Sequence, residues 1–250
     1  MADQDELEVI LVTEMTDAAV HWDEIARKLS GGAHAVLYSK ALLPIGELEK
    51  LPHVACSVTI TGWGGTWLEP CVMPPNLLVG WLNDAHKTLG DRVRLRIDPI
   101  VPSAEGFERA AKVASMVDFP IRTTVSLLQF YKGMEGTFRG LRLDPKIYTV
   151  KSGRAWFPRK EVAENAYHRL MGANPNLTYQ FCGMPYEVGD THTGCVDDDL
   201  LAAIGVTKFK RVRPGFQRPG CKCVIKKLQL VSGACPHGCQ YCYARHGRKQ

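Results

Sequence analysis

Three cysteines near the C-terminal end carry the strongest chemical signal in the sequence. Cys235, Cys239 and Cys242 follow the spacing C-x3-C-x2-C, and Tyr241 comes directly before the third cysteine. Three thiolates on one short loop can bind three irons of a 4Fe-4S cluster and leave the fourth iron without a protein ligand. A structural zinc site is the alternative, but zinc takes four ligands, and His237 between two cysteines would bind only under strain. The spacing therefore favours a cluster with one open iron.

Four further cysteines form a second candidate set, Cys182, Cys195, Cys221 and Cys223. Cys182 ends an expected strand and the others lie in loops after Gly or Pro-Gly, so all four can converge at one end of the fold. Four thiolates suit a second 4Fe-4S cluster or a zinc ion, and plain buried thiols are the alternative. We expect ligation, with a cluster ahead of zinc.

The composition excludes several classes of protein. Hydrophobic residues make up 45% and charged residues 23%, which is typical of a globular chain with a full core. No stretch approaches the roughly 20 apolar residues of a bilayer span, and the acidic start does not resemble an export signal. Nine cysteines, an odd number, fit a reduced compartment better than a disulfide framework. We therefore expect a cytoplasmic protein with no membrane partner.

Charge is divided unevenly along the chain. Residues 201–250 contain eleven Lys or Arg and no Asp or Glu, a charge of +11, whereas residues 1–200 sum to −6. Such asymmetry indicates an anionic partner at the C-terminal end. DNA or RNA is the leading class, and a phosphorylated small molecule or an acidic electron donor, such as flavodoxin or ferredoxin, is the alternative.

Patterns typical of strands and of helices alternate along the chain that carries these residues. Short apolar runs predict seven strands, at residues 7–13, 33–39, 54–61, 93–97, 121–127, 177–182 and 223–231. Helical patterns predict helices at residues 18–29, 45–51, 75–89, 103–117, 158–171 and 196–204. Residues 131–156, rich in Gly and basic residues, predict a long surface loop.

Alternating strands and helices indicate right-handed βαβ units and a parallel sheet. We expect an α/β protein with a single (β/α) TIM-like barrel, closed or partial, rather than a doubly wound sheet. Residues 1–205 would form the barrel body. Residues 206–250 would be a basic, cysteine-rich segment that completes the barrel and carries the cluster-binding loop.

The alternation of side chains along a strand identifies which of them face the barrel interior. Arg94, Arg96 and Asp98 share one face of their strand, and Lys40 ends another strand at the catalytic end. An inert interior is filled with branched aliphatic side chains, so a polar one predicts a lumen that holds a ligand. Lys40, Arg96 and Asp98 are therefore candidate catalytic residues, and a buried salt bridge between Arg96 and Asp98 is the alternative.

A turn after the third predicted strand contains candidate cofactor-binding residues. Thr61, Gly62 and Trp63 precede further glycines in an order that does not match a phosphate-binding loop. This turn would lie beside the ligand, with Trp63 as a stacking surface. Together with Tyr241 of the cysteine loop, these three residues are the predicted contacts to a cofactor.

The cysteine loop resembles that of the radical S-adenosylmethionine (SAM) enzymes, C-x3-C-x-aromatic-C. The resemblance implies that the open iron binds the amino and carboxylate groups of SAM, and that reductive cleavage gives a 5'-deoxyadenosyl radical that abstracts hydrogen from a substrate. In that superfamily the loop follows the first barrel strand, whereas here it lies at the far C-terminal end.

That placement, together with other segments, resembles an uncharacterised family, domain of unknown function eighteen-forty-eight, of barrel-like proteins with such a loop at the C-terminal end. The matching segments are residues 38–40, 59–64, 96–100, 194–198, 217–218, 221–223 and 235–244. The expected function is a radical SAM enzyme that modifies or repairs a nucleic-acid base or nucleotide. The alternative is a non-catalytic nucleic-acid-binding module, in which Fe-S or zinc only folds the basic tail.

Overall fold

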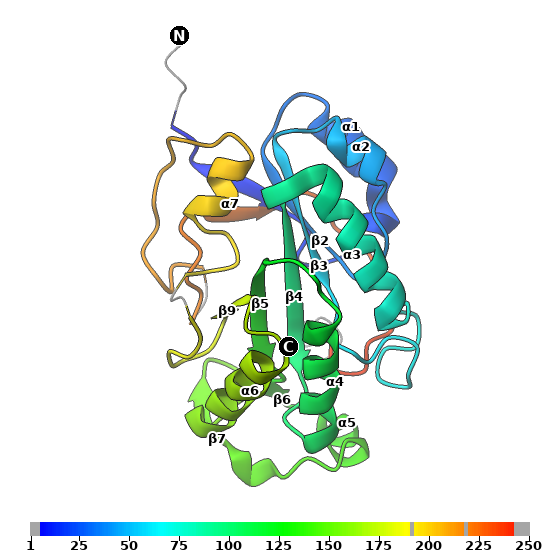
Figure 1. Ribbon diagram of the computed structural model, residues 1–250. Helices are drawn as coiled ribbons and strands as arrows, with labels where there is room; N and C mark the ends of the chain where they lie inside the picture. The colour runs from blue at the N-terminus through cyan, green and yellow to red at the C-terminus, as the bar shows by residue number, and fades with distance from the viewer. Residues whose placement is uncertain (1–5, 191–192, 218–219, 243–250) are drawn as a thin grey trace.

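The computed structural model describes residues 6–190, 193–217 and 220–242. Seven strands form one parallel sheet in the order β10-β1-β2-β3-β4-β5-β9, which curls into a half-barrel (Figure 1). The strands are β1 Val9–Val12, β2 Ala35–Ser39, β3 Val54–Thr59, β4 Val93–Ile100, β5 Arg122–Leu127, β9 Thr178–Phe181 and β10 Lys226–Gln229. The predicted α/β class and parallel sheet are confirmed, and the barrel is the partial form.

Helices between the strands cover the outer face of the sheet, as α3, α4 and α6 show in Figure 1. They are η1 Ala18–His21, α1 Trp22–Leu29, α2 Ile45–Glu49, α3 Pro75–Leu89, η2 Gly90–Arg92, α4 Ala104–Ser115, α6 Lys160–Ala173 and α7 Asp198–Ala203. A side-chain cap marks the start of α4, where the Ser103 hydroxyl accepts a hydrogen bond from the Gly106 amide at 3.1 Å. Apolar side chains of the strands, such as Leu37, Val58 and Leu95, are fully buried in the core.

The predicted surface loop at residues 131–156 is wrong, because this region has its own small fold. It contains α5 Glu135–Gly140, η3 Pro145–Ile147 and an antiparallel sheet of β6 Phe130–Tyr131, β8 Ala155–Pro158 and β7 Tyr148–Ser152. Rings of Phe130, Phe138 and Tyr148 form its core, with centroids 4.8 and 5.0 Å apart for the two contacts to Phe138. We call residues 128–160 the insertion. It lies beyond the carboxyl end of β5, at the lower end of Figure 1.

The last strand of the chain lies beside the first. β10 pairs in parallel with β1, from Val9 opposite Lys226 to Val12 opposite Gln229. The segment after β10 therefore leaves the sheet at the same end as the segments after β1, β2 and β3. In space, the cysteine loop thus follows an edge strand of the half-barrel, although it comes last in the sequence. None of the helices within the described residues is long and apolar enough to cross a membrane.

Candidate functional site

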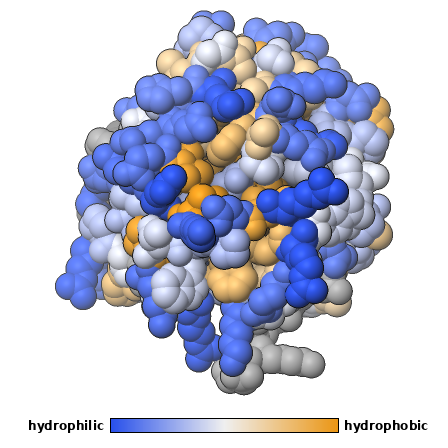
Figure 2. All heavy atoms as spheres, turned by 90° about the horizontal axis from the view of Figure 1, so that it is seen from below, coloured by the Kyte–Doolittle hydropathy of each residue, from blue (hydrophilic) through white to orange (hydrophobic). Residues whose placement is uncertain are grey.

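A cavity of about 240 Å³ opens at the carboxyl ends of the parallel strands. Its lining comes from the ends of β1, β2, β3, β4, β5 and β9, from the start of the insertion and from the cysteine loop. Figure 2 views the molecule from the lower end of Figure 1 and shows apolar side chains at the centre of the face, surrounded by hydrophilic ones. The carboxyl ends of the strands are where barrel enzymes place their active sites.

All three cysteines of the loop line this cavity. Cys235 is exposed, Cys239 is buried and Cys242 is half-buried, and Gly238 between them has a φ of 65°, which an L side chain adopts only with strain. Burial raises the pKa of the Cys239 thiol to about 11, against the opposing charge of Lys40. A cluster binds each thiolate to a different iron, so three thiols facing one cavity from one loop fit it.

The described side chains do not form a ready-made site for a single metal ion. In the parts of the chain that the structure describes, no three or more His, Cys, Asp or Glu side chains are spaced to hold one metal ion as they stand. Metal binding by either cysteine set therefore stays a prediction.

The cysteine loop is held by a buried ion pair. His237 Nε2 lies 2.6 Å from Asp17 Oδ2, and His237 Nδ1 lies 3.3 Å from the carbonyl oxygen of Cys71. A carboxylate and a carbonyl oxygen both accept hydrogen bonds. Both ring nitrogens therefore act as donors, which requires the doubly protonated, cationic imidazolium. Burial opposes charge on both partners, but the hydrogen bond raises the pKa of His237 and lowers that of Asp17. Both pKa shifts therefore favour the ionised form of the pair.

Asp17 binds three further groups besides His237. Its carboxylate accepts hydrogen bonds from the Ser39 hydroxyl at 2.7 Å, the Lys40 amide at 2.6 Å and the Ala19 amide at 2.9 Å. The last bond caps η1, while the first two come from the end of β2. One buried carboxylate thus joins the end of β2, the start of η1 and the cysteine loop.

Glu69 stands behind the cavity wall with 1% of its surface exposed. It accepts hydrogen bonds from Lys40 Nζ, from the Tyr241 hydroxyl and, at 2.6 Å, from the Thr61 hydroxyl. Burial alone would raise the pKa of Glu69, but the charge and hydrogen bond of Lys40 hold it below its ordinary value. The network joins Lys40, a predicted catalytic residue, to Tyr241 of the cysteine loop.

Arg96 and Asp98 both line the cavity and also form a salt bridge with each other. The Ser126 hydroxyl donates to Asp98, and the guanidinium of Arg96 lies 4.6 Å from the centroid of the Tyr38 ring. Burial disfavours the charge of Arg96, but Asp98 outweighs it and raises the pKa. The Nε of Arg96 is buried without a hydrogen-bond partner among the described residues. The salt bridge therefore leaves Arg96 with an unused donor.

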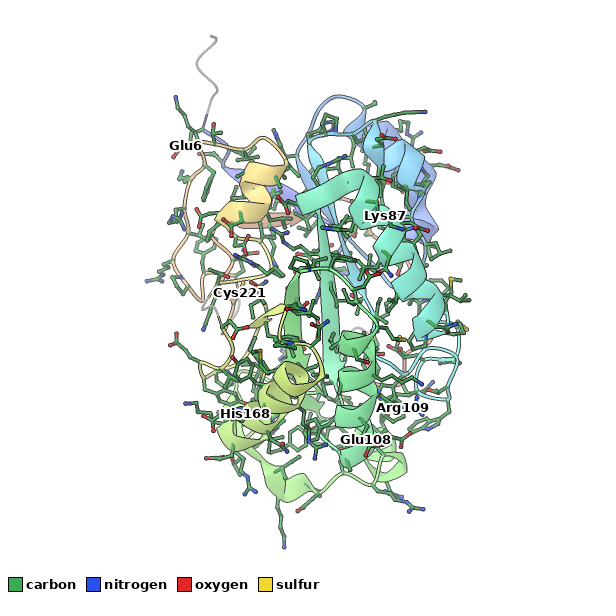
Figure 3. All side chains as sticks on the ribbon, viewed as in Figure 1. Glu6, Lys87, Glu108, Arg109, His168 and Cys221 are labelled. Atoms are coloured by element: carbon green, nitrogen blue, oxygen red, sulfur yellow. The ribbon has the colours of Figure 1, made fainter. Side chains whose placement is uncertain are left out.

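Only one of the four predicted cofactor contacts lines the cavity. Tyr241 lines the cavity, whereas Thr61, Gly62 and Trp63 are buried behind it. The guanidinium of Arg109, on α4 (Figure 3), lies 4.3 Å from the Trp63 ring and donates to the Gly62 carbonyl at 3.0 Å. These contacts favour a supporting role for the turn, and direct contact with a cofactor remains a prediction for it.

The second cysteine set gathers as the sequence predicts. Cys195 Sγ lies 3.5 Å from Cys223 Sγ and 3.3 Å from the Tyr38 hydroxyl. Cys182 and Cys223 both hydrogen-bond the Cys195 thiol and lower its pKa, and Cys223 lowers the pKa of Cys221 to about 6. All four cysteines are buried in one cluster, and Cys182 also lines the cavity. The set therefore lies directly beside the candidate site.

Three site residues escaped sequence reasoning, namely Asp17, Glu69 and His237. Asp17 had a signal, since Asp directly before a predicted helix is a preferred cap, but its bond to His237 is a tertiary contact. Glu69 lies in a loop without periodicity, where nothing in the sequence indicates burial. The position of His237 between two cysteines indicates only a metal ligand, and its bond to Asp17 is a tertiary contact.

Part of the basic C-terminal segment lies far from the cavity. Lys208, Phe209 and Arg211 surround a shallow hollow with Glu6, which Figure 3 places at the upper end of the molecule, opposite the insertion. The Leu7 amide bonds the Lys208 carbonyl at 3.1 Å, just before β1 begins. Residues 207–211 thus lie at the amino ends of the strands. Arg245, Arg248 and Lys249 lie outside the described residues.

The fold is similar to that of spore photoproduct lyase. Two mutant forms of that enzyme match with TM-scores of 0.51 and 0.52, each at 15% sequence identity, over 71% and 72% of this chain. The chain spans 61% and 62% of the length of those two structures. No curated protein matches it.

A family model described as "Domain of unknown function (DUF1848)" matches residues 34–244. The matched region runs from just before β2 through the cysteine loop, and it includes both cysteine sets and all the predicted catalytic residues. This chain belongs to the DUF1848 family.

Proposed function

We propose that this protein is a radical SAM enzyme that acts on a nucleic-acid base or nucleotide in the cavity at the carboxyl ends of the strands. The observation that carries the proposal is the convergence of Cys235, Cys239 and Cys242 on one cavity of a half-barrel, which charged side chains also line. The shared fold with spore photoproduct lyase supports it.

In this proposal the three loop cysteines hold a 4Fe-4S cluster. When bound, the cluster and SAM supply a 5'-deoxyadenosyl radical. The Asp17–His237 pair fixes the loop against the end of β2, so that the thiols keep facing the cavity. Glu69 holds Lys40 and Tyr241 in place at the wall.

Arg96 is the residue we propose for binding an anionic group of the ligand. The salt bridge to Asp98 stabilises its positive charge, and its buried Nε–H can donate a hydrogen bond to a carboxylate or phosphate. Lys40 offers a second cation on the same wall. The electron needed to start the reaction would come from a carrier such as flavodoxin or ferredoxin.

For the second cysteine set we infer a single zinc ion. Zinc holds sulfur at about 2.3 Å in a tetrahedron, which sets neighbouring sulfurs about 3.8 Å apart. The 3.5 Å between Cys195 and Cys223 is close to that spacing. Thiolates of a cluster bind separate irons and stand further apart, so the spacing of this one pair supports zinc over the expected second cluster, and the other described thiols must rearrange to complete a single-ion site.

Anaerobic reconstitution with iron and sulfide, followed by SAM and dithionite, tests the proposal. Chromatography should detect 5'-deoxyadenosine with the wild-type protein and none with the variant C235A/C239A/C242A. C71A is the control, because its exposed thiol belongs to neither cysteine set. Equal SAM cleavage by the triple variant would refute the radical SAM function.

A further inference from the structure

The insertion carries a strong positive charge that faces the solvent. Residues 128–160 contain eight Lys or Arg and two Asp or Glu, a net charge of +6 in a body that is otherwise acidic. All eight basic residues are exposed, namely Lys132, Arg139, Arg142, Lys146, Lys151, Arg154, Arg159 and Lys160. Over the described ranges, Lys132, Arg139, Arg142 and Lys146 take part in no ion pair. Their charges are therefore available to a polyanion.

This basic face borders the cavity. Leu128, Gln129 and Tyr131, at the start of the insertion, line the cavity wall. The Thr137 hydroxyl on α5 donates to the carbonyl of Gln240, inside the cysteine loop, at 3.0 Å. A single-stranded nucleic acid bound along the insertion would thus pass directly beside the cysteine loop.

An exposed tryptophan lies beside the basic face of the insertion. Trp67 is 51% exposed and lies against α5, where a Cβ built on Gly140 would come 3.1 Å from its ring. Gly140 follows Arg139, so the exposed ring and the basic face are adjacent. Aromatic rings flanked by basic residues bind single-stranded nucleic acids, because each base can stack on a ring while the cations bind phosphates.

The other basic surface is poorly placed for this role. Residues 207–211 lie at the amino ends of the strands, opposite the cavity. Their charge is also partly neutralised, since Lys210 pairs with Glu8 at 3.0 Å and Arg211 pairs with Asp198. Lys227, further along, pairs with Glu14 and is nearly buried.

We propose that the basic face of the insertion, with Trp67 beside it, binds the phosphate backbone of a single-stranded nucleic acid whose base enters the cavity. This inference rests on the proposed function, and it assigns the substrate contact to residues 128–160 rather than to residues 207–211. A base taken out of its stack would reach the cavity while its neighbours remain on the insertion.

Two variants of equal charge change decide between the two surfaces. One variant reverses four charges of the insertion, K132E/R139E/R142E/K146E. The other reverses four charges of the basic segment at the amino ends of the strands, K208E/K210E/R211E/R213E. Each variant lowers the net charge by eight. Fluorescence anisotropy with labelled single-stranded DNA, single-stranded RNA and duplex DNA measures binding at several salt concentrations. Thermal melting shows that each variant is folded.

The insertion variant should bind the single strands at least about tenfold more weakly, with a log-log salt slope that is shallower by about 0.7 for each lost phosphate contact. The amino-end variant should bind nearly as the wild type does. W67A should weaken binding by at least about fivefold through lost stacking. Whether DNA or RNA binds more tightly identifies the nucleic acid.

An equal loss in both charge variants, or a loss only in the amino-end variant, overturns the inference. Absence of wild-type binding to every oligonucleotide at low salt also overturns it and points to a small phosphorylated substrate. SAM cleavage by the wild type without oligonucleotide is measured in parallel. It reports on the proposed function alone, so the two failures are distinguishable.

Discussion

His237 and Asp17 are 220 residues apart in the sequence, yet they form a buried ion pair with 2.6 Å between Nε2 and Oδ2. The bond connects the cysteine loop to the segment that joins β1 and η1. Because Asp17 also binds the end of β2, the position of the loop depends on one carboxylate.

The substitution D17N removes the charge of this ion pair. Asn caps a helix start as well as Asp does, so the bond from the Ala19 amide to Oδ1 is kept, whereas Oδ2, which accepts from His237 and from the Lys40 amide, is replaced by an NH2 group that cannot accept. A hydrogen bond between charged groups contributes about 1.5–3 kcal/mol, and we expect a loss of that size in the free energy of unfolding. Urea denaturation measures it, and iron content after reconstitution should fall with it. Wild-type iron content in D17N would show that the pair does not position the loop.

Removal of Glu69 should be more damaging than its neutralisation. E69A leaves the Lys40 ammonium without its buried counter-ion, which costs about 3–5 kcal/mol. E69Q retains an acceptor for the Thr61 hydroxyl and should cost less. Urea denaturation at pH 7 ranks the variants, and equal stability of the two would contradict the assigned role of the charge.

The same carboxylate predicts a pH dependence. The pKa of Glu69 is lowered in the folded state from its ordinary value of 4.5, so its ionised form adds stability above pH 4.5. That stability is lost as the pH falls from 4.5 through the lowered pKa. The difference in melting temperature between wild type and E69Q should therefore shrink as the pH is lowered from 6 towards 3. A constant difference over this range would show that Glu69 does not titrate as described.

Gly64 should tolerate no side chain. A Cβ at this position would lie 2.0 Å from the carbonyl oxygen of Met73, so G64A must displace the loop that carries Glu69. We expect a loss of about 1–3 kcal/mol. The matched control is G80A on α3, where a Cβ meets nothing within 4 Å and alanine should stabilise the helix by about 0.5–1 kcal/mol. Thermal melting compares them, and equal effects would contradict the close approach.

The second cysteine set should retain metal when the first is removed. The variant C235A/C239A/C242A should lose its iron and keep about one zinc per chain, measured by elemental analysis. Adding C223S should remove that zinc, because it takes away one sulfur of the pair that Cys195 and Cys223 form. About four irons retained in the triple variant would indicate a second cluster, and neither metal would indicate plain thiols.

The sequence alone indicated most of the sheet. Buried parallel strands appear as short apolar runs, and the runs at residues 33–39, 54–61 and 121–127 correspond to β2, β3 and β5. The insertion was invisible because β6, β7 and β8 have two to five residues, too few for a periodic pattern. Whether the barrel closes depends on which strands pair, and local patterns do not encode pairing.

The amino-acid sequence limits the available chemistry, since the types and spacing of the cysteines restrict the groups that they can bind. The place of that chemistry in the molecule depends on contacts between distant segments. A parallel strand carries the chain from one end of the sheet to the other, so β10 separates residues 207–211, at the amino ends, from the cysteine loop at the carboxyl ends. Glu69 meets Lys40 and Tyr241 only because three distant segments fold against one another, and burial then makes their charges matter.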